Sequence, residues 1–281
     1  MSHPNRNSGG TPQTPRARRT FWGCTRVWCL LWTVLAGLYL PAVLILEYAV
    51  GDSFVPAYVA RYAPQLLFVL PMGVPLFFAV ICWRKRLIWV NLALIAVGVG
   101  ALMPPSFPAR RPRTQPAERI RVATWNVHEE FRNAAALRVA LAEQAPQIVC
   151  LQEARRDIFG TVLRGAEAAH THEVTTLTTG HIEAERAIRL GPYPNYRWGL
   201  ETRIRLPQGR LTILNVHFLT AFTGRSIRRH RHDLEGFLRR TAEARRLEAE
   251  VVREWLEHTA GPRLVMGDFN SPPGSDPYRH L

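Results

Sequence analysis

The chain has 281 residues and a formal charge of +14 at neutral pH, a length that allows one good-sized domain and additional segments. Its four cysteines form no CxxC pair, so neither a disulfide framework nor a cysteine-based structural zinc site is expected. Lys85 is the only lysine among 36 basic residues, and this bias toward arginine reflects base composition as much as selection for binding. The charge alone is therefore not evidence for a nucleic-acid partner.

Three long apolar stretches follow a basic N-terminal tail. Residues 1–20 are rich in Pro, Gly, Ser, Asn and Arg and are expected to be disordered. In the membrane region, residues 21–104, the stretches Val27–Leu46, Ala63–Trp83 and Leu87–Met103 each have about the length that crosses the hydrocarbon core of a bilayer. The sequence thus predicts three transmembrane helices. The alternative for the third stretch is a helix buried in a protein core.

Basic residues beside these stretches predict the orientation in the membrane. The segment before the first stretch and the loop between the second and third are both basic, which places both in the cytoplasm. Three crossings then place the C-terminal domain outside the cytoplasm, in an integral protein expected in the cell inner membrane. Arginines that follow the third stretch argue for the opposite placement. They are Arg110, Arg111 and Arg113.

A Pro- and Arg-rich linker, residues 105–118, leads to a globular domain at residues 119–281. Short apolar or alternating runs in this domain predict strands, and Ala/Leu-rich or amphipathic stretches predict helices. The predicted helices are residues 133–144, 154–170 and 227–258. The predicted strands are residues 120–126, 148–151, 173–177, 196–205, 210–218 and 264–266.

Polar side chains recur at one kind of position, at or just past the end of a predicted strand. They are Asn126, Glu153, His217, Asp268 and Asn270. A rigid sheet can hold such side chains in a fixed constellation. Carboxylate and amide oxygens suit Mg²⁺ or Mn²⁺, and a histidine can stabilise charge on a phosphoryl group. The structural alternative is that Asn126 caps a turn and that Asp268 and Asn270 form another turn.

Four stretches of the chain resemble motifs of the endonuclease/exonuclease/phosphatase family, which has the deoxyribonuclease-I-like fold. They occur in the family's order, each after a predicted strand. The resemblance implies an α/β (α+β) domain built as a four-layer sandwich, with two mixed sheets face to face and helices outside. The three transmembrane helices would precede it. The stretches are Val122–Val127, Ile148–Glu153, Asn215–Phe218 and Gly267–Asn270.

The resemblance also implies a role for each matched residue. Glu153 would be the main metal carboxylate, with Asn126 beside it. Asp268 would orient or deprotonate the attacking water, Asn270 would touch phosphate or metal, and His217 would face the scissile phosphate. The implied reaction is hydrolysis of a phosphodiester or phosphomonoester by metal-activated water, with Mg²⁺ or Mn²⁺ as cofactor. Nucleic acid and phospholipid head groups are both expected substrates, because a fold does not choose between them.

The end of the chain departs from the family pattern. Family members close with a Ser-Asp-His or similar motif on a last strand, whereas Ser275-Asp276 is followed here by Pro277. We therefore expect the second sheet to lack its last strands, as in a fragment or a naturally truncated copy. The alternative function is a non-catalytic, membrane-anchored relative that binds metal or a partner without turnover.

Overall fold

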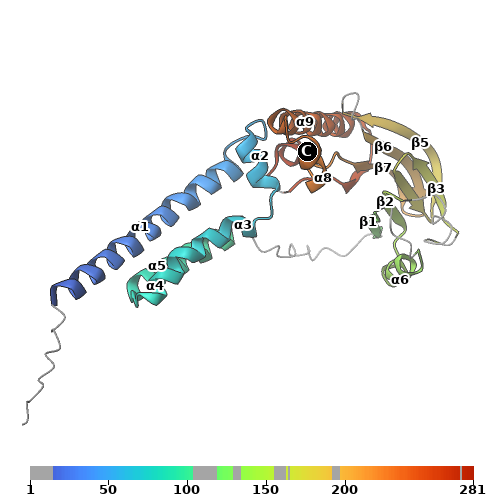
Figure 1. The fold of residues 1–281 in the computed structure, drawn as a ribbon. Coiled ribbons are helices and arrows are strands. Elements are labelled where there is room, and N and C mark those ends of the chain that lie inside the picture. Colours follow the sequence, from blue (N-terminus) through green and yellow to red (C-terminus); the bar gives the residue numbers. More distant parts are fainter. Residues whose placement is uncertain are drawn as a thin grey trace, which may run out of the picture. The chain divides into compact units, whose positions relative to one another are not determined.

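The chain forms two compact units (Figure 1). The first consists of residues 1–49 and 63–108, and the second of residues 50–62 and 109–281. The sequence places residues 50–62 in the membrane region, whereas the structure groups them with the C-terminal domain. The predicted linker, residues 105–118, lies outside the described residues. The computed structural model describes residues 15–103, 119–128, 134–154, 163, 165–191, 197–272 and 274–281.

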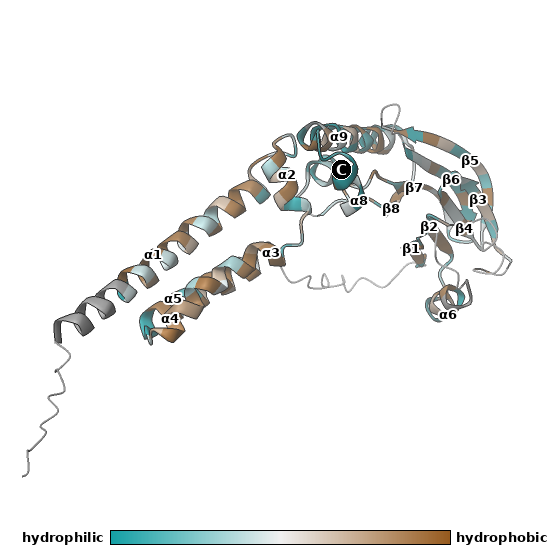
Figure 2. Cartoon of the chain, in the orientation of Figure 1, coloured by the Kyte–Doolittle hydropathy of each residue, from teal (hydrophilic) through white to brown (hydrophobic). Residues whose placement is uncertain are grey.

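The first unit consists of mostly apolar helices, as the hydropathy colours show (Figure 2). Among the described residues, Thr25–Tyr48 and Lys85–Leu102 are each long and apolar enough to cross a membrane. By length and composition, a third span is counted when the bent helix pair Val55–Tyr62 and Leu66–Ile81 is taken as one. Of the second predicted stretch, Leu66–Ile81 is helical, and the first and third predicted stretches lie in single helices. The helices of this unit are α1 (Pro15–Tyr48), α3 (Leu66–Val69), the 3-10 helix η1 (Leu70–Met72), α4 (Gly73–Ile81) and α5 (Lys85–Leu102).

Helix α1 begins earlier than the apolar pattern predicts. It starts at Pro15, so residues 15–20, which the sequence assigns to the disordered tail, are helical. Proline is favoured at the first helical position, because its φ is preset and its missing N–H would have no partner there. The following Arg and Ala residues are good helix formers, so the helix extends into the basic segment. Residues 1–14 lie outside the described residues.

A buried polar contact joins two helices of the first unit. Asn91 of α5 donates to Thr33 Oγ1 of α1 at 3.0 Å and to Leu87 O at 2.8 Å. Interhelical bonds of this kind stabilise helix pairs in apolar surroundings. Most side chains of the two membrane-length helices are exposed in the structure. Only 28% of the apolar part of Thr25–Tyr48 and 17% of that of Lys85–Leu102 are buried. Helices that are apolar all round and yet exposed are typical of membrane spans.

The described residues of the second unit form two four-stranded mixed sheets, called sheet A and sheet B. Sheet A has the order β1-β2-β4-β3, with β1 and β2 parallel and the other pairs antiparallel. Sheet B has the order β5-β6-β7-β8, with only β7 and β8 parallel. The strands of sheet A are β1 (Val122–Asn126), β2 (Ile148–Gln152), β3 (Glu167–Thr171) and β4 (Val174–Thr178). The strands of sheet B are β5 (His181–Leu190), β6 (Arg197–Leu206), β7 (Gly209–His217) and β8 (Arg263–Asp268).

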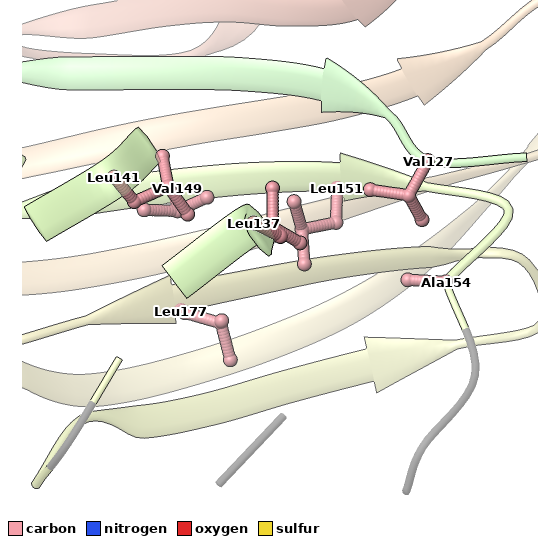
Figure 3. Packing of buried hydrophobic residues seen from close by; sticks show 7 residues of the cluster. All are labelled: Val127, Leu137, Leu141, Val149, Leu151, Ala154 and Leu177. Carbon is pink, nitrogen blue, oxygen red and sulfur yellow. The ribbon is translucent and has the colours of Figure 1, made fainter. Parts of the chain in front are cut away.

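Side chains of β2 alternate between two hydrophobic layers. Val149 and Leu151 pack with Leu137 and Leu141 of helix α6 (Ala134–Gln144), which covers the outer face of sheet A (Figure 3). The opposite face of β2 packs on sheet B. This inner cluster contains Ile148, Cys150, Ile204, Leu206 and Ile213. Because both of its faces are covered, β2 has a continuous apolar sequence and is fully buried.

Helix α9 (Leu234–His258) covers the outer face of sheet B. Its Ala249, Val252 and Trp255 pack with side chains of β5 and β7. The layers therefore follow the order α6, sheet A, sheet B, α9. This arrangement confirms the predicted sandwich of two mixed sheets with outer helices.

One predicted helix is partly wrong. Residues 167–170 of the segment 154–170 belong to β3, which pairs antiparallel with β4. Local propensity favours a helix in this Glu-Ala-Ala-His sequence, but pairing with a neighbouring strand overrides propensity. Residues 155–162 and 164 of this segment lie outside the described residues. Strand β5 was not predicted either, for the same reason, since its sequence is rich in Glu, Ala and Arg.

The long helix predicted at residues 227–258 is divided in two. Helix α8 (Gly224–Arg229) begins with a capping box between Thr223 and Ser226. Residues 230–233 interrupt the helix before α9 begins. In the described part of this unit, the remaining helices are α2 (Val55–Tyr62) and α10 (Asp276–His280).

Candidate active site

Four of the five predicted site residues meet at one edge of the sandwich. Asn126 is the last residue of β1, and Glu153 directly follows β2. His217 and Asp268 are the last residues of β7 and β8 and are partners in the register of sheet B. Because β1 and β2 are parallel, as are β7 and β8, the carboxyl ends of each pair lie at the same sheet edge. The strand-end pattern in the sequence therefore corresponds to a cluster in space.

The side-chain amide of Asn126 connects the carboxylates of the two sheets. Its Nδ2 donates to Glu153 Oε1 at 3.1 Å and to Asp268 Oδ2 at 2.8 Å. Its Oδ1 accepts from the backbone N–H of His128 at 3.0 Å. Asn126 thus caps a turn, as the structural alternative expects, and also reaches both carboxylates.

The imidazole of His217 lies among three carboxylates. Its side chain is only 2% exposed. Nε2 is 3.4 Å from Glu153 Oε1 and 4.0 Å from Asp268 Oδ2, and Nδ1 is 3.4 Å from Glu173 Oε2. Within the described part of the chain, neither ring nitrogen has a hydrogen bond of good geometry. The ring is therefore held by packing and lies within ion-pair distance of these carboxylates.

Glu173 is a site residue that the sequence did not reveal. It lies in the turn between β3 and β4, and Arg197 Nη1 donates to both of its oxygens at 2.9 and 2.7 Å. Burial would raise the pKa of Glu173, but His217 and Arg197 together hold that pKa below its usual value. The available signal was its place just before β4, whose first residue pairs with the end of β2.

The turn after β8 fixes Asp268 from its own backbone. Oδ1 of Asp268 accepts from the backbone N–H of Asn270 at 2.8 Å. The side-chain Nδ2 of Asn270 donates to Phe218 O, just past β7, at 2.9 Å. Asn270 therefore contacts the cluster through Asp268, and its amide nitrogen holds the turn against the neighbouring strand.

Two buried amides join the sheets beneath the cluster. Gln152 Nε2 donates to Asn215 Oδ1 at 2.7 Å and to Thr124 Oγ1 at 3.2 Å. Asn215 Nδ2 in turn donates to Thr175 O at 2.8 Å and to Leu151 O at 3.3 Å. Asn215 belongs to sheet B and the other four residues to sheet A, so the three bonds of Asn215 cross the interior of the sandwich.

A family model described as "Endonuclease/Exonuclease/phosphatase family" matches residues 123–281, which is more than half of the chain. The chain belongs to the endonuclease/exonuclease/phosphatase family. The match contains all of the cluster residues described above. A search among curated proteins finds no significant match.

Solved structures with a similar fold show low sequence identity. A functionally unknown conserved protein from Enterococcus faecalis V583 is 17% identical, with a TM-score of 0.43, over 57% of this chain and 70% of that one. D. rerio TDP2 complexed with a single-strand DNA product is 15% identical, with a TM-score of 0.43, over 54% and 61%. A mutant of beta toxin from Staphylococcus aureus with bound magnesium ions is 10% identical, with a TM-score of 0.43, over 57% and 68%.

The side chains that this family member brings together have the chemistry of a divalent-cation site. Glu153, Glu173 and Asp268 are hard oxygen donors, and Arg197 is the guanidinium that pairs with one of them. Among the described residues, Glu153 and Asp268 form no ion pair with a guanidinium. Those residues contain no group of three His, Cys, Asp or Glu side chains already arranged to hold a metal ion. At present, the amide nitrogen of Asn126 lies against both carboxylates.

Beside the cluster, a buried carboxylate makes the stability of this family member sensitive to pH. Glu248 of α9 is fully buried, and its two oxygens accept from the Leu219 N–H at 3.2 and 3.0 Å. Burial raises the pKa of Glu248 to about 7, although the Leu219 N–H and Arg245 act in the opposite direction. The folded protein therefore holds a proton that the unfolded chain has already lost near pH 5.

We expect Glu248→Gln to be more stable than the wild type above pH 7. The stabilisation from protonated Glu248 is present below the unfolded pKa of 4.5 and is lost as pH rises through the folded pKa of about 7. The full loss is about 3 kcal/mol, and glutamine avoids it because it stays neutral. Melting temperatures at pH 5 and pH 8 test this. Glu254→Gln, at an exposed position on the same helix, is the control. If the melting temperature of Glu248→Gln changed between pH 5 and pH 8 as much as that of the wild type, the expectation would be contradicted.

Proposed function

We propose that the protein is a membrane-anchored, divalent-metal-dependent phosphoesterase that hydrolyses a phosphodiester, of nucleic acid or of a phospholipid head group, with water. The observation that carries this proposal is the meeting of Asn126, Glu153, His217 and Asp268 at the ends of four strands. The membership of the chain in the endonuclease/exonuclease/phosphatase family agrees with the chemistry of these side chains. A constellation held by two sheets can position reacting atoms with little change in the backbone.

Each residue of the cluster has a role in this proposal. Glu153 and Asn126 would hold Mg²⁺ or Mn²⁺, for which the Asn126 amide would turn its oxygen toward Glu153. A bound divalent cation offsets the negative charge on the phosphate oxygens. Asp268 would orient the attacking water and accept its proton, helped by Asn270, which fixes this carboxylate. His217 would stabilise charge on the scissile phosphate, and Glu173 would hold the imidazole in place.

Glu153→Gln tests the metal assignment by thermal stability rather than by activity. Mg²⁺ at about 100 times its Kd should stabilise the wild type by about 2.7 kcal/mol, which corresponds to a Tm rise of roughly 5–10 °C. Glu153→Gln should show no rise, because an amide is a weaker ligand than a carboxylate. Glu235→Gln, at an exposed position on α9, should behave like the wild type. Equal shifts in all three proteins would remove Glu153 from the metal site.

Substrate class can be read from two assays. A nuclease should bind polyanions with an affinity that falls steeply as salt rises. A phospholipid-cleaving enzyme should hydrolyse detergent-dispersed phospholipid and leave DNA uncleaved. Metal binding without turnover of either substrate would identify the non-catalytic relative instead.

We propose further that three crossings anchor the protein in the inner membrane and place residues 119–281 outside the cytoplasm. The basic flanks of the first and second apolar stretches support this orientation. The grouping of residues 50–62 with the C-terminal domain supports the number of crossings, because two crossings after residue 62, with Ala63–Trp83 as the first of them, return the chain to the side on which residues 50–62 lie. In a variant without native cysteines, an impermeant thiol reagent applied to intact cells should label Ala260→Cys but not Lys85→Cys. The reverse pattern would invert the orientation.

A further inference from the structure

A short segment between two apolar stretches is part of the C-terminal domain. In residues 50–62, helix α2 packs against α9 and the loop that precedes α8. Tyr58 is fully buried in this contact, among Ala221, Leu238 and Ala242, and its hydroxyl donates to Ala221 O at 3.3 Å. Full burial of a tyrosine side chain indicates a stable packing contact between α2 and the rest of the domain.

A second contact joins the start of this segment to the end of the domain. The backbone N–H of Asp52 donates to Asp276 Oδ2 at 2.6 Å, and that of Asp276 donates to Asp52 Oδ2 at 3.1 Å. The Arg61 guanidinium, which is 1% exposed, pairs with Asp52 and lies 4.0 Å from Asp276. The two carboxylates are therefore stabilised by backbone donors and by one buried cation.

The third contact leads to the candidate active site. Arg245 of α9 is fully buried, and its guanidinium donates to Leu219 O, to Asn270 O at 2.8 Å and to Phe269 O at 3.3 Å. It also donates to Ser271 Oγ and to the Tyr62 hydroxyl at 3.2 Å. The Arg245 carbon Cζ lies 5.0 Å from the centre of the Tyr62 ring. One charged group thus binds the turn after Asp268 and is itself bound by α2.

Nη1 of Arg245 donates to Leu219 O, whereas the other four acceptors share the two N–H groups of Nη2. The guanidinium is planar and rigid, so a tilt would move both nitrogens relative to their acceptors. In the turn, these acceptors are the backbone carbonyls of the two residues after Asp268 and the hydroxyl of Ser271, so such a tilt would shift the turn. Tyr62 limits such a tilt from two directions, through its ring and through its hydroxyl. The buried guanidinium of Arg245 also needs hydrogen-bond partners, because burying a charge without them costs desolvation free energy.

We propose that residues 50–62 are a positioning element of the phosphoesterase site, in which Tyr62 orients Arg245 and Arg245 fixes the turn that carries Asp268 and Asn270. This inference rests on the proposed function for its effect on turnover, but its effect on the turn does not. The catalytic unit is then discontinuous in sequence. One of its parts lies between membrane segments, and Tyr62 and Arg245 are positioning residues.

Hydrogen exchange in the full-length protein, measured by mass spectrometry without metal or substrate, tests the effect on the turn. Tyr62→Leu removes the ring and the hydroxyl, and we expect the amides of residues 267–271 to exchange about tenfold faster. Tyr62→Phe keeps the ring and should rescue most of the protection. Tyr48→Leu is the matched control, because it removes a tyrosine hydroxyl that donates to Ala101 O at 2.6 Å in the other unit.

Turnover of bis(p-nitrophenyl) phosphate in the same variants should follow the order of exchange, with a lower kcat for Tyr62→Leu and an unchanged KM. Faster exchange at residues 267–271 in Tyr62→Leu than in the wild type, together with no turnover by the wild type, would support the positioning element and defeat the proposed function. Normal exchange and normal kcat in Tyr62→Leu, with an active wild type, would overturn the positioning element alone. Uniformly faster exchange across the domain would overturn it too, because Tyr62 would then act on overall stability.

Discussion

Asp268→Asn should lower kcat by about 10²- to 10⁴-fold, the usual contribution of a positioned proton acceptor. The carboxylate accepts the Asn126 amide at one oxygen and the Asn270 N–H at the other, 2.8 Å from each. An asparagine can accept only one of these donors and cannot take a proton from water. We expect KM to change little and the Mg²⁺-induced rise in Tm to remain, because the proposed metal ligands are still present. Steady-state kinetics with bis(p-nitrophenyl) phosphate would measure the effect.

Asp233→Asn is the matched control for this substitution. Asp233 is an exposed carboxylate that pairs with Arg240 at 2.8 Å in the turn before α9. Its loss should leave kcat within about twofold of the wild type, as exposed ion pairs contribute little. If Asp268→Asn kept wild-type turnover, Asp268 would not be the group that activates water.

Gly267→Ala should cause the largest loss of stability of any single methyl addition near the site. Gly267 has φ +142 and is paired with Val216 of β7, and a Cβ on it would lie 1.9 Å from Val216 O. No side-chain rotation can relieve a contact with backbone. We expect the free energy of unfolding to fall by about 4 kcal/mol or more and the Tm by more than about 10 °C. Thermal or urea unfolding followed by circular dichroism would measure this.

Gly209→Ala separates backbone strain from steric overlap. Gly209 has a similar φ of +128, but nothing lies within 4 Å of the position of its Cβ. This variant bears only the conformational cost, about 1–2 kcal/mol. Equal destabilisation of the two variants would show that the close approach to Val216 is not the reason for glycine at position 267.

The strands that the sequence predicts well are those with an unambiguous pattern. The buried run before Glu153 and the alternating run before Asn126 give β2 and β1, because both faces or one face of each is covered by apolar neighbours. The cluster was predictable in part for the same reason. Side chains that follow parallel strands lie at a common edge, which brings Asn126 to Glu153 in one sheet and His217 to Asp268 in the other. The meeting of these two pairs was expected from the family resemblance.

The features that the sequence did not reveal depend on contacts between distant segments. Strand β5 is an edge strand whose local composition favours a helix, and it is defined by its pairing with β6. Glu173 lies in a turn and belongs to the site only because β4 runs antiparallel to β2. The place of Tyr62 in the C-terminal domain cannot be read from hydropathy, since its partner Arg245 is 183 residues away.

The buried amides of Gln152 and Asn215 restrict the lateral alignment of the two sheets. Asn126 and Glu153 come from one sheet, and His217 and Asp268 from the other, so every distance between these pairs depends on how the sheets lie against each other. Apolar side chains resist separation of the layers but tolerate a small lateral slip, because their attraction is not directional. Hydrogen bonds between amides tolerate much less. The interior of the sandwich thus sets the lateral alignment with a few polar bonds and leaves cohesion to the hydrophobic side chains around them.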